Sequence, residues 1–185
     1  MNAQSWGYAA AQNASALGVN PDALAATCEV ESQCQSITTH AAGSTITGAF
    51  QMSNGTYQEE MGKALQSNPG LAASIGDSGL SGQTDPATQA VAAAQYLKDA
   101  ALKLQSSGIS NPTALDTRAF YNFGGTNGAA VAQADADMTM AAAMPDVSQD
   151  TLTQNGIAPG ETVVQWRSAV AAQMGTSANA PVLTS

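Results

Sequence analysis

The segment from Cys28 to Cys34 reads Cys-Glu-Val-Glu-Ser-Gln-Cys and places acidic residues in a run that otherwise has an apolar helical pattern. A carboxyl group held against apolar surroundings favours its neutral form, so it can give up a proton near neutral pH. A general acid needs this property. The segment makes an enzyme the first hypothesis.

Glu31 is the better candidate for this acid because of its place on a helix predicted over residues 21–33. Glu29 and Glu31 are two residues apart, so their side chains point about 200° apart on a helix. Leu24, Cys28 and Glu31 follow spacings of four and three, which puts Glu31 on the apolar stripe. The alternative is a partly buried glutamate that caps another helix or lies at an exposed helix end.

Two further segments could hold a ligand beside that acid. Residues 48–52, Gly-Ala-Phe-Gln-Met, place the neutral amide of Gln51 at a tight turn. Residues 120–125, Phe-Tyr-Asn-Phe-Gly-Gly, place a phenol and an amide at a predicted helix end. Taken alone, each segment is more simply explained by packing, as a turn into a core Phe and Met and as an aromatic anchor before a C-cap glycine.

Composition excludes several classes of partner. The 185-residue chain is 10% charged and has a formal net charge of -9, with five Lys and Arg in total. Nucleic-acid binding needs clustered basic residues to neutralise phosphates, and the sequence has no such cluster. No apolar run approaches the roughly 20 residues of a membrane span. We therefore expect no nucleic acid as partner and no membrane span.

The cysteines and the N-terminus bear on the compartment. If Cys28 and Cys34 pair, the compartment is oxidising and the bridge lies around a helix end, because a straight helix would separate them by about 9 Å. The alternative is two buried free thiols. The N-terminus lacks a basic region and a long apolar stretch, so no signal peptide is visible. With His40 in a Thr- and Gly-rich loop as the single histidine, no metal or cofactor is expected.

Helix signals dominate and strand signals are thin, so the predicted class is mostly α. Alanine is abundant, and Asn-Pro or Asp-Pro pairs indicate helix starts at Pro21, Pro86 and Pro112. We expect one domain over residues 1–174 and a flexible tail over 175–185. Helices are predicted over residues 4–17, 21–33, 54–66, 86–104, 112–122, 129–143 and 161–174.

Taken in order, the three segments resemble the motifs of the lytic transglycosylases of the soluble (SLT) type, a family with a lysozyme-like fold. Glu31-Ser32 resembles the family's Glu-Ser motif. Gly48-Ala49-Phe50-Gln51 is similar to its Gly-Leu-Met-Gln motif, and Phe120-Tyr121-Asn122 to its Ala-Tyr-Asn motif. Tyr96-Leu97 resembles the Tyr-Leu pair between the second and third motifs.

The resemblance covers roughly residues 20–130, and the chain departs from the family pattern in places. Ala49-Phe50 replaces Leu-Met, Phe120 replaces Ala, and residues from Val147 onward match nothing in the pattern. These departures affect the details of ligand binding more than the identity of the acid.

The resemblance implies cleavage of the β-1,4 bond between N-acetylmuramic acid and N-acetylglucosamine in peptidoglycan, with Glu31 as the only acid and base. It implies a periplasmic or otherwise exported protein, and a Tyr121 hydroxyl that orients Glu31. The residues implied to bind substrate are Ser32, Gly48, Phe50, Gln51, Tyr121 and Asn122.

Two alternatives stay open at this point. One is a lysozyme-like hydrolase on the same fold, in which water attacks instead of a substrate hydroxyl. The other is a non-catalytic wall-binding or structural component of a secretion or phage assembly. The acidic surface mildly favours the second alternative, because peptidoglycan is itself anionic.

Overall fold

The computed structural model describes residues 1–38 and 42–184. Within these ranges it contains α-helices, short 3₁₀ helices and isolated β-bridges, and no β-strand. This confirms the predicted mostly α class. The elements are α1 (Gly7–Ala16), α2 (Pro21–Ser32), α3 (Asn54–Ser67), η1 (Pro69–Ala73), η2 (Leu80–Thr84), α4 (Pro86–Ser106), α5 (Ala114–Gln133), α6 (Met140–Ala143), α7 (Gln149–Gln154), α8 (Val163–Met174) and η3 (Gly175–Asn179).

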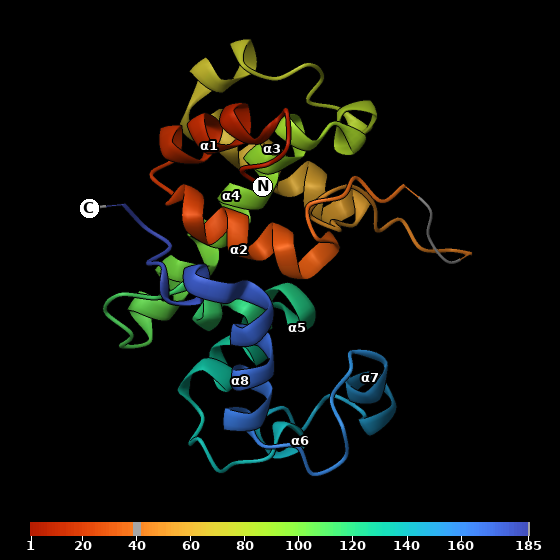
Figure 1. The fold of residues 1–185 in the computed structure, drawn as a ribbon, viewed down its shortest axis with the longest axis vertical. Helices are drawn as coiled ribbons and strands as arrows, with labels where there is room; N and C mark the ends of the chain where they lie inside the picture. The colour runs from red at the N-terminus through yellow and green to blue at the C-terminus, as the bar shows by residue number, and fades with distance from the viewer. Residues whose placement is uncertain (39–41, 185) are drawn as a thin grey trace.

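Helix α4 is the central element of the fold. It contacts α1, α2, α3 and α5, and residues 90–94, Ala-Val-Ala-Ala-Ala, are fully buried. Small side chains let the neighbouring helices approach α4 closely. In Figure 1, α1 to α4 form the upper part of the molecule, whereas α5 and α8 lead down to α6 and α7 at the other end.

The observed helix N-termini test the capping residues that were predicted from the sequence. Asn20 caps α2 through the amide of Asp22 at 3.0 Å, and Asp85 caps α4 through the amide of Thr88 at 2.9 Å, as the Asn-Pro and Asp-Pro pairs predicted. Helix α5 begins at Ala114, two residues later than predicted from Pro112. The reason is a reciprocal capping box that makes Thr113 the N-cap.

The second half of the chain departs from the predicted helix over residues 129–143. Helix α5 breaks at Gly124, where φ is 75°, and then continues to Gln133. The chain then leaves the helix until the short α6 begins at Met140. Gly124 adopts the left-handed region that glycine tolerates best, so the Gly-Gly signal marked a kink between two helical segments.

The predicted flexible tail is corrected by the structure, because residues 175–184 are docked against the helices. The amide of Asn20 donates to the carbonyl of Val182 at 2.8 Å, and the amide of Val182 donates to the carbonyl of Pro112 at 2.9 Å. Ala178 and Val182 are buried. The segment therefore joins the starts of α2 and α5 through backbone hydrogen bonds, which composition does not reveal.

Cys28 and Cys34 form a disulfide around the end of α2, as the first of the two sequence alternatives required. Gln33 and Cys34 have φ angles of 54° and 57°, and this left-handed turn brings the two cysteine Cα atoms to 4.9 Å. The bridge encloses the last helical turn, which carries Glu31. Among the described helices, none combines the length and apolarity that crossing a bilayer requires.

We predict that Cys28→Ala/Cys34→Ala lowers the free energy of unfolding by about 2 kcal/mol, because a short closed loop is lost from the unfolded chain. Urea unfolding followed by circular dichroism measures this change. Thiol labelling of the unfolded wild type without reductant should fail, and rapid labelling would show that the bridge does not form in solution.

Candidate active site

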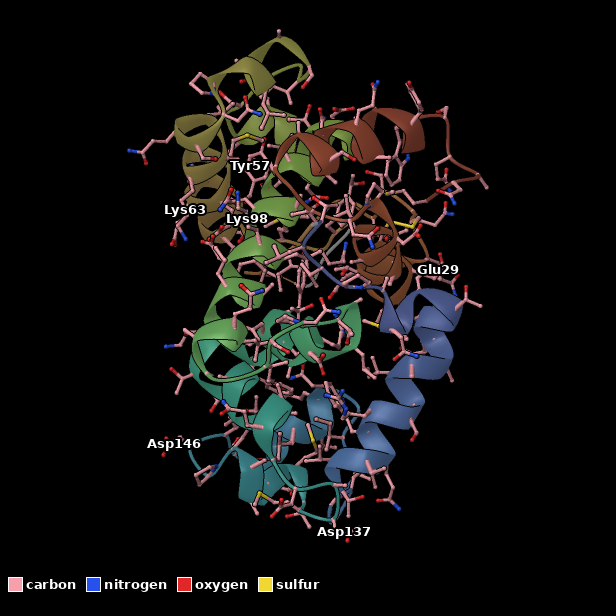
Figure 2. The ribbon with its side chains drawn as sticks, turned by 90° about the vertical axis from the view of Figure 1, so that its left-hand side faces the viewer. Glu29, Tyr57, Lys63, Lys98, Asp137 and Asp146 are labelled. Carbon is pink, nitrogen blue, oxygen red and sulfur yellow. A yellow bond between two sulfur atoms is a disulfide. The ribbon has the colours of Figure 1, made fainter. Side chains whose placement is uncertain are left out.

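Glu31 lies on the last turn of α2 with its side chain only 14% exposed. Leu24 and Cys28, which share its stripe, are fully buried, whereas Glu29 is exposed at the edge of the molecule (Figure 2). The predicted orientation of the two glutamates is therefore confirmed. The Glu31 carboxylate forms an ion pair with the guanidinium of Arg118, which comes from α5 and is 9% exposed.

Two opposing effects act on the proton of Glu31. Burial raises the pKa of the Glu31 carboxyl, and the charge and hydrogen bond of Arg118 lower it. Burial is the larger effect, so the pKa stays above the ordinary value for glutamate. Glu31 can therefore act as a proton donor in the neutral form, and its ionised form already has a partner.

Tyr121 lies three residues after Arg118, on the same face of α5. Its hydroxyl is buried and has no hydrogen-bond partner among the described residues, and its ring packs edge-on against Tyr96 with 5.1 Å between ring centroids. Burial, followed by the charge of Glu31, raises the pKa of Tyr121 well above its ordinary value. Tyr121 is thus a neutral phenol close to the acid.

The structure assigns the orienting role differently from the sequence prediction. The contact that holds Glu31 comes from Arg118, while the Tyr121 hydroxyl makes no hydrogen bond to the carboxylate in the described structure. Arg118 was missed by the sequence analysis. Its spacing of three from Tyr121 was the signal that could have identified it, because that spacing places both side chains on one helix face.

The loop after Gly48 is held by a buried side chain from α4 that sequence reasoning also missed. Gln89 is fully buried; its Nε2 donates to the carbonyl of Thr47 at 2.8 Å, and its Oε1 accepts from the amide of Phe50 at 2.9 Å. Gly48 has a φ of 86°, and a Cβ at this position would collide with the Gln89 side chain. Gly48 thus makes room for the anchor of the loop.

Three of the motif residues shape this loop from within. Ser32 is buried and donates to the carbonyl of Ala49 at 2.6 Å, so it fastens the end of α2 to the loop. The Gln51 amide donates to the carbonyl of Gly48 at 2.7 Å. Phe50 is fully buried, with its ring edge-on to Trp6. The prediction that Phe50 contacts a ligand is therefore wrong, because its side chain belongs to the core.

A cavity of about 210 Å³ lies between this loop, α3, α4 and α5. Neither Glu31 nor Asn122 lines the cavity, whereas Tyr121 does, and the charge of Glu31 acts on the pKa of this tyrosine. Its wall combines two aromatic rings with amide and hydroxyl groups and contains no carboxylate. The lining residues are Ile46, Gln51, Met52, Ser53, Thr56, Tyr96 and Tyr121.

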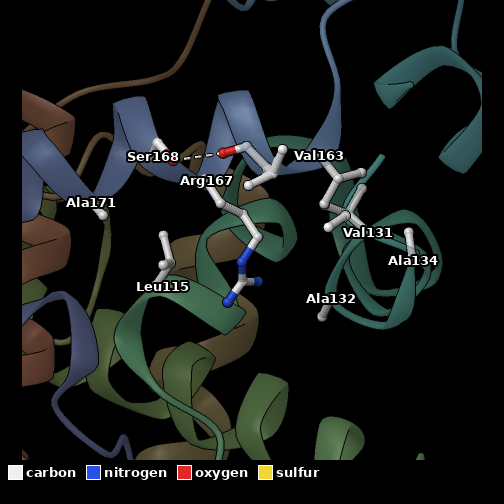
Figure 3. A pocket seen from close by; sticks show the side chains of 10 residues that line it. Leu115, Val131, Ala132, Ala134, Val163, Arg167, Ser168 and Ala171 are labelled. Atoms are coloured by element: carbon white, nitrogen blue, oxygen red, sulfur yellow. Dashed lines mark hydrogen bonds between the residues drawn. The ribbon is translucent and has the colours of Figure 1, made fainter. Parts of the chain in front are cut away.

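A second cavity, of about 290 Å³, lies between α5 and α8 and contains none of the predicted site residues (Figure 3). Its wall is mainly apolar. The charged group within it, Arg167, is paired with Asp116 at 2.6 Å, and the Ser168 hydroxyl donates to the carbonyl of Val164 at 2.7 Å. The charged group of this cavity is therefore already paired within the protein.

In the part of the chain that the structure describes, no group of three or more His, Cys, Asp or Glu side chains is arranged so that it could hold a metal ion. His40 lies outside the described residues. The described site thus combines a buried carboxyl whose pKa is raised with a nearby cavity lined by neutral amide and hydroxyl groups.

We predict that Gln89→Leu lowers the free energy of unfolding by about 3 kcal/mol, because two buried backbone groups lose their partner. Urea unfolding measures the change. Gln105→Leu, an exposed position on the same helix, is the control and should change stability by less than about 0.5 kcal/mol. Equal effects at both positions would contradict an anchoring role for Gln89.

Comparison of the sequence with models of protein families and with curated proteins found no match.

Proposed function

We propose that this protein is a peptidoglycan lytic transglycosylase with a lysozyme-like arrangement of its helices, and that Glu31 is its acid and base. The observation that carries the proposal is the environment of Glu31. Its pKa is raised by burial, Arg118 holds the ionised form, and a neutral phenol lies nearby. A group that must first give up a proton and then take one back needs support in both protonation states.

In the first step, the protonated Glu31 donates its proton to the oxygen of the β-1,4 bond as the bond from that oxygen to the anomeric carbon breaks. The acetamido group of the substrate stabilises the positive charge at that carbon. Glu31 is left as a carboxylate, and its ion pair with Arg118 lowers the energy of this state. Arg118 therefore contributes most after the proton has left.

In the second step, the Glu31 carboxylate takes the proton of the muramyl 6-hydroxyl, whose oxygen forms a bond to the anomeric carbon. The product is a 1,6-anhydro sugar, Glu31 is protonated again, and no water is consumed. The Tyr121 hydroxyl has an unused donor and acceptor near the acid and can bind a substrate hydroxyl.

The lining of the cavity supports a neutral sugar ring as the ligand. Tyr96 and Tyr121 provide aromatic surface, and Gln51, Ser53 and Thr56 provide neutral hydrogen-bonding groups. Most glycoside hydrolases place a second carboxylate at the scissile bond, to activate water or to attack the sugar. Glu31 itself does not line the cavity, so the absence of carboxylates from its wall does not distinguish the single-acid reaction from the hydrolase alternative. The products of the assay below distinguish them.

The disulfide between Cys28 and Cys34 supports an exported protein, because such bonds persist in oxidising compartments. The substrate would be met in the cell envelope, in agreement with this location. A place in a secretion or phage assembly belongs to the non-catalytic alternative, and the assay below distinguishes it by the absence of any released product.

We predict that Glu31→Gln keeps the fold and lowers the rate of muropeptide release by at least about 100-fold, because the proton donor is lost. Mass spectrometry of digested cell walls measures the products. Glu29→Gln, two residues away and exposed, is the matched control and should retain activity. Products with reducing ends would support a hydrolase, and retained activity in Glu31→Gln would refute the assignment.

We predict that Arg118→Met moves the alkaline limb of the pH profile of kcat/KM to higher pH by at least about one unit, because the nearby positive charge lowers the pKa of Glu31. Activity needs the protonated acid, so it declines as pH rises through that pKa. Lys98→Met removes an equal charge and should leave the profile unchanged. A profile that keeps its position in Arg118→Met would show that Arg118 does not act on Glu31.

A further inference from the structure

A larger groove of about 480 Å³ continues from the cavity beside Tyr121 along α3, α4 and α5. The two spaces share Thr56 and Tyr96 in their walls, so they lie next to each other. The wall of the larger groove is charged, in contrast to the neutral cavity. The groove is therefore expected to bind a different chemical group of the ligand than the cavity does.

The charged wall is built around Lys63, and we call its four residues the Lys63 cage. The Nζ atom of Lys63 lies 2.9 Å from Glu59, 2.7 Å from Glu60 and 3.0 Å from Asp99, in each case measured to a carboxylate oxygen. An ammonium group has three donors, so Lys63 is saturated, while each carboxylate keeps unused acceptor positions. Lys103 also lines the groove, so with all groups ionised three negative charges meet two positive charges and the wall keeps a net charge of about -1.

Two buried acceptors at the cage lack a donor. Glu60 is 3% exposed and lines the groove, and its Oε2 has no hydrogen-bond partner in the described part of the chain. Gln95 donates to Asp99 at 2.7 Å, and its own Oε1 is buried and without a partner there, although Gln95 does not line the groove. Buried acceptors are normally satisfied, so the unpaired oxygen of Glu60 favours a ligand that brings N–H donors and positive charge.

The groove also contains aromatic surface, from Tyr96 and Phe120. The hydroxyl of Tyr96 is already used by the carbonyl of Phe120 at 2.8 Å. Carboxylates combined with aromatic rings are the chemistry that recognises alkylammonium groups. Convergent metal-binding sets of acidic side chains are absent from residues 1–38 and 42–184, so a metal ion fits this wall less well.

We infer that the groove beside the Lys63 cage is a subsite for a primary ammonium group, supplied by the peptide stem of the substrate. The choice of the peptide stem as the source of the ammonium group rests on the proposed function, since the diamino acids of peptide stems bear cationic side-chain amines. Such a subsite would help a chain of net charge -9 to bind a polymer that is itself anionic.

The direct test is binding of Nα-acetyl-lysine methylamide to the full chain, followed by the backbone amide signals in NMR. We expect saturable shifts in α3 and α4 near the cage, and none with the Nε-acetylated probe, which lacks the charge. Higher salt should weaken binding. Equal shifts with both probes, or no shift near the cage, would overturn the inference without any reference to catalysis.

A pair of double variants locates the site. Glu59→Gln/Asp99→Asn should weaken binding of the free-amine probe at least about fivefold, which corresponds to about 1 kcal/mol. Asp137→Asn/Asp146→Asn makes the same change in charge at exposed positions at the opposite end of the molecule from Lys63 (Figure 2), and should leave binding unchanged. If both double variants weaken binding equally, the probe responds only to the net charge of the chain, and the subsite is refuted.

A kinetic test links the subsite to the substrate. The wild type should show a KM at least about threefold higher on cell walls with acetylated stem amines than on untreated walls, and Glu59→Gln/Asp99→Asn should lose this difference. An equal KM on both substrates would overturn the peptide stem as carrier. If wild type and Glu31→Gln release no product while the probe still binds, the proposed function fails and the ammonium site stands.

Discussion

The ion pair between Glu31 and Arg118 is the contact on which the candidate site depends. It joins the end of α2 to α5 and buries both charges almost completely. Truncating one partner of such a pair costs about 3–5 kcal/mol, because the remaining charge is left without compensation. The substitution Glu31→Gln avoids most of this cost, because the amide oxygen can still accept the hydrogen bond from Arg118. The position of Glu31 is therefore tied to the packing of two helices that are distant in sequence, and Tyr121 is brought to the acid by the same stretch of α5.

Several motif residues act by building the site instead of touching a ligand. Ser32 fastens α2 to the loop, Gly48 leaves room for the Gln89 anchor, and Phe50 fixes the loop in the core. The loop then presents Gln51 to the cavity. The residues of a short motif therefore reflect the packing of its segment as much as the chemistry of its ligand. Resemblance at such positions is evidence for the conformation of the loop before it is evidence for the ligand.

The sequence could predict those features that local chemistry decides. The side chains of Asn20 and Asp85 cap helices within three residues of themselves, and the periodic spacing of Leu24, Cys28 and Glu31 indicated the buried face of α2. The features that it could not predict depend on partners far along the chain. Gln89 reaches a loop about 40 positions earlier, and the C-terminal segment is held by backbone groups, which have no signature in side-chain pattern.

The disulfide around the end of α2 has a consequence for when the acid is assembled. Gln33 and Cys34 both adopt left-handed backbone angles, a conformation that costs about 1–2 kcal/mol for each residue with a side chain. Covalent closure by the bridge offsets this cost to a similar extent. While the two thiols are reduced, no covalent bond opposes relaxation of this turn, which directly follows the helical turn that carries Glu31. For the exported enzyme proposed above, oxidation of the two thiols would therefore be the step that completes the surroundings of its acid.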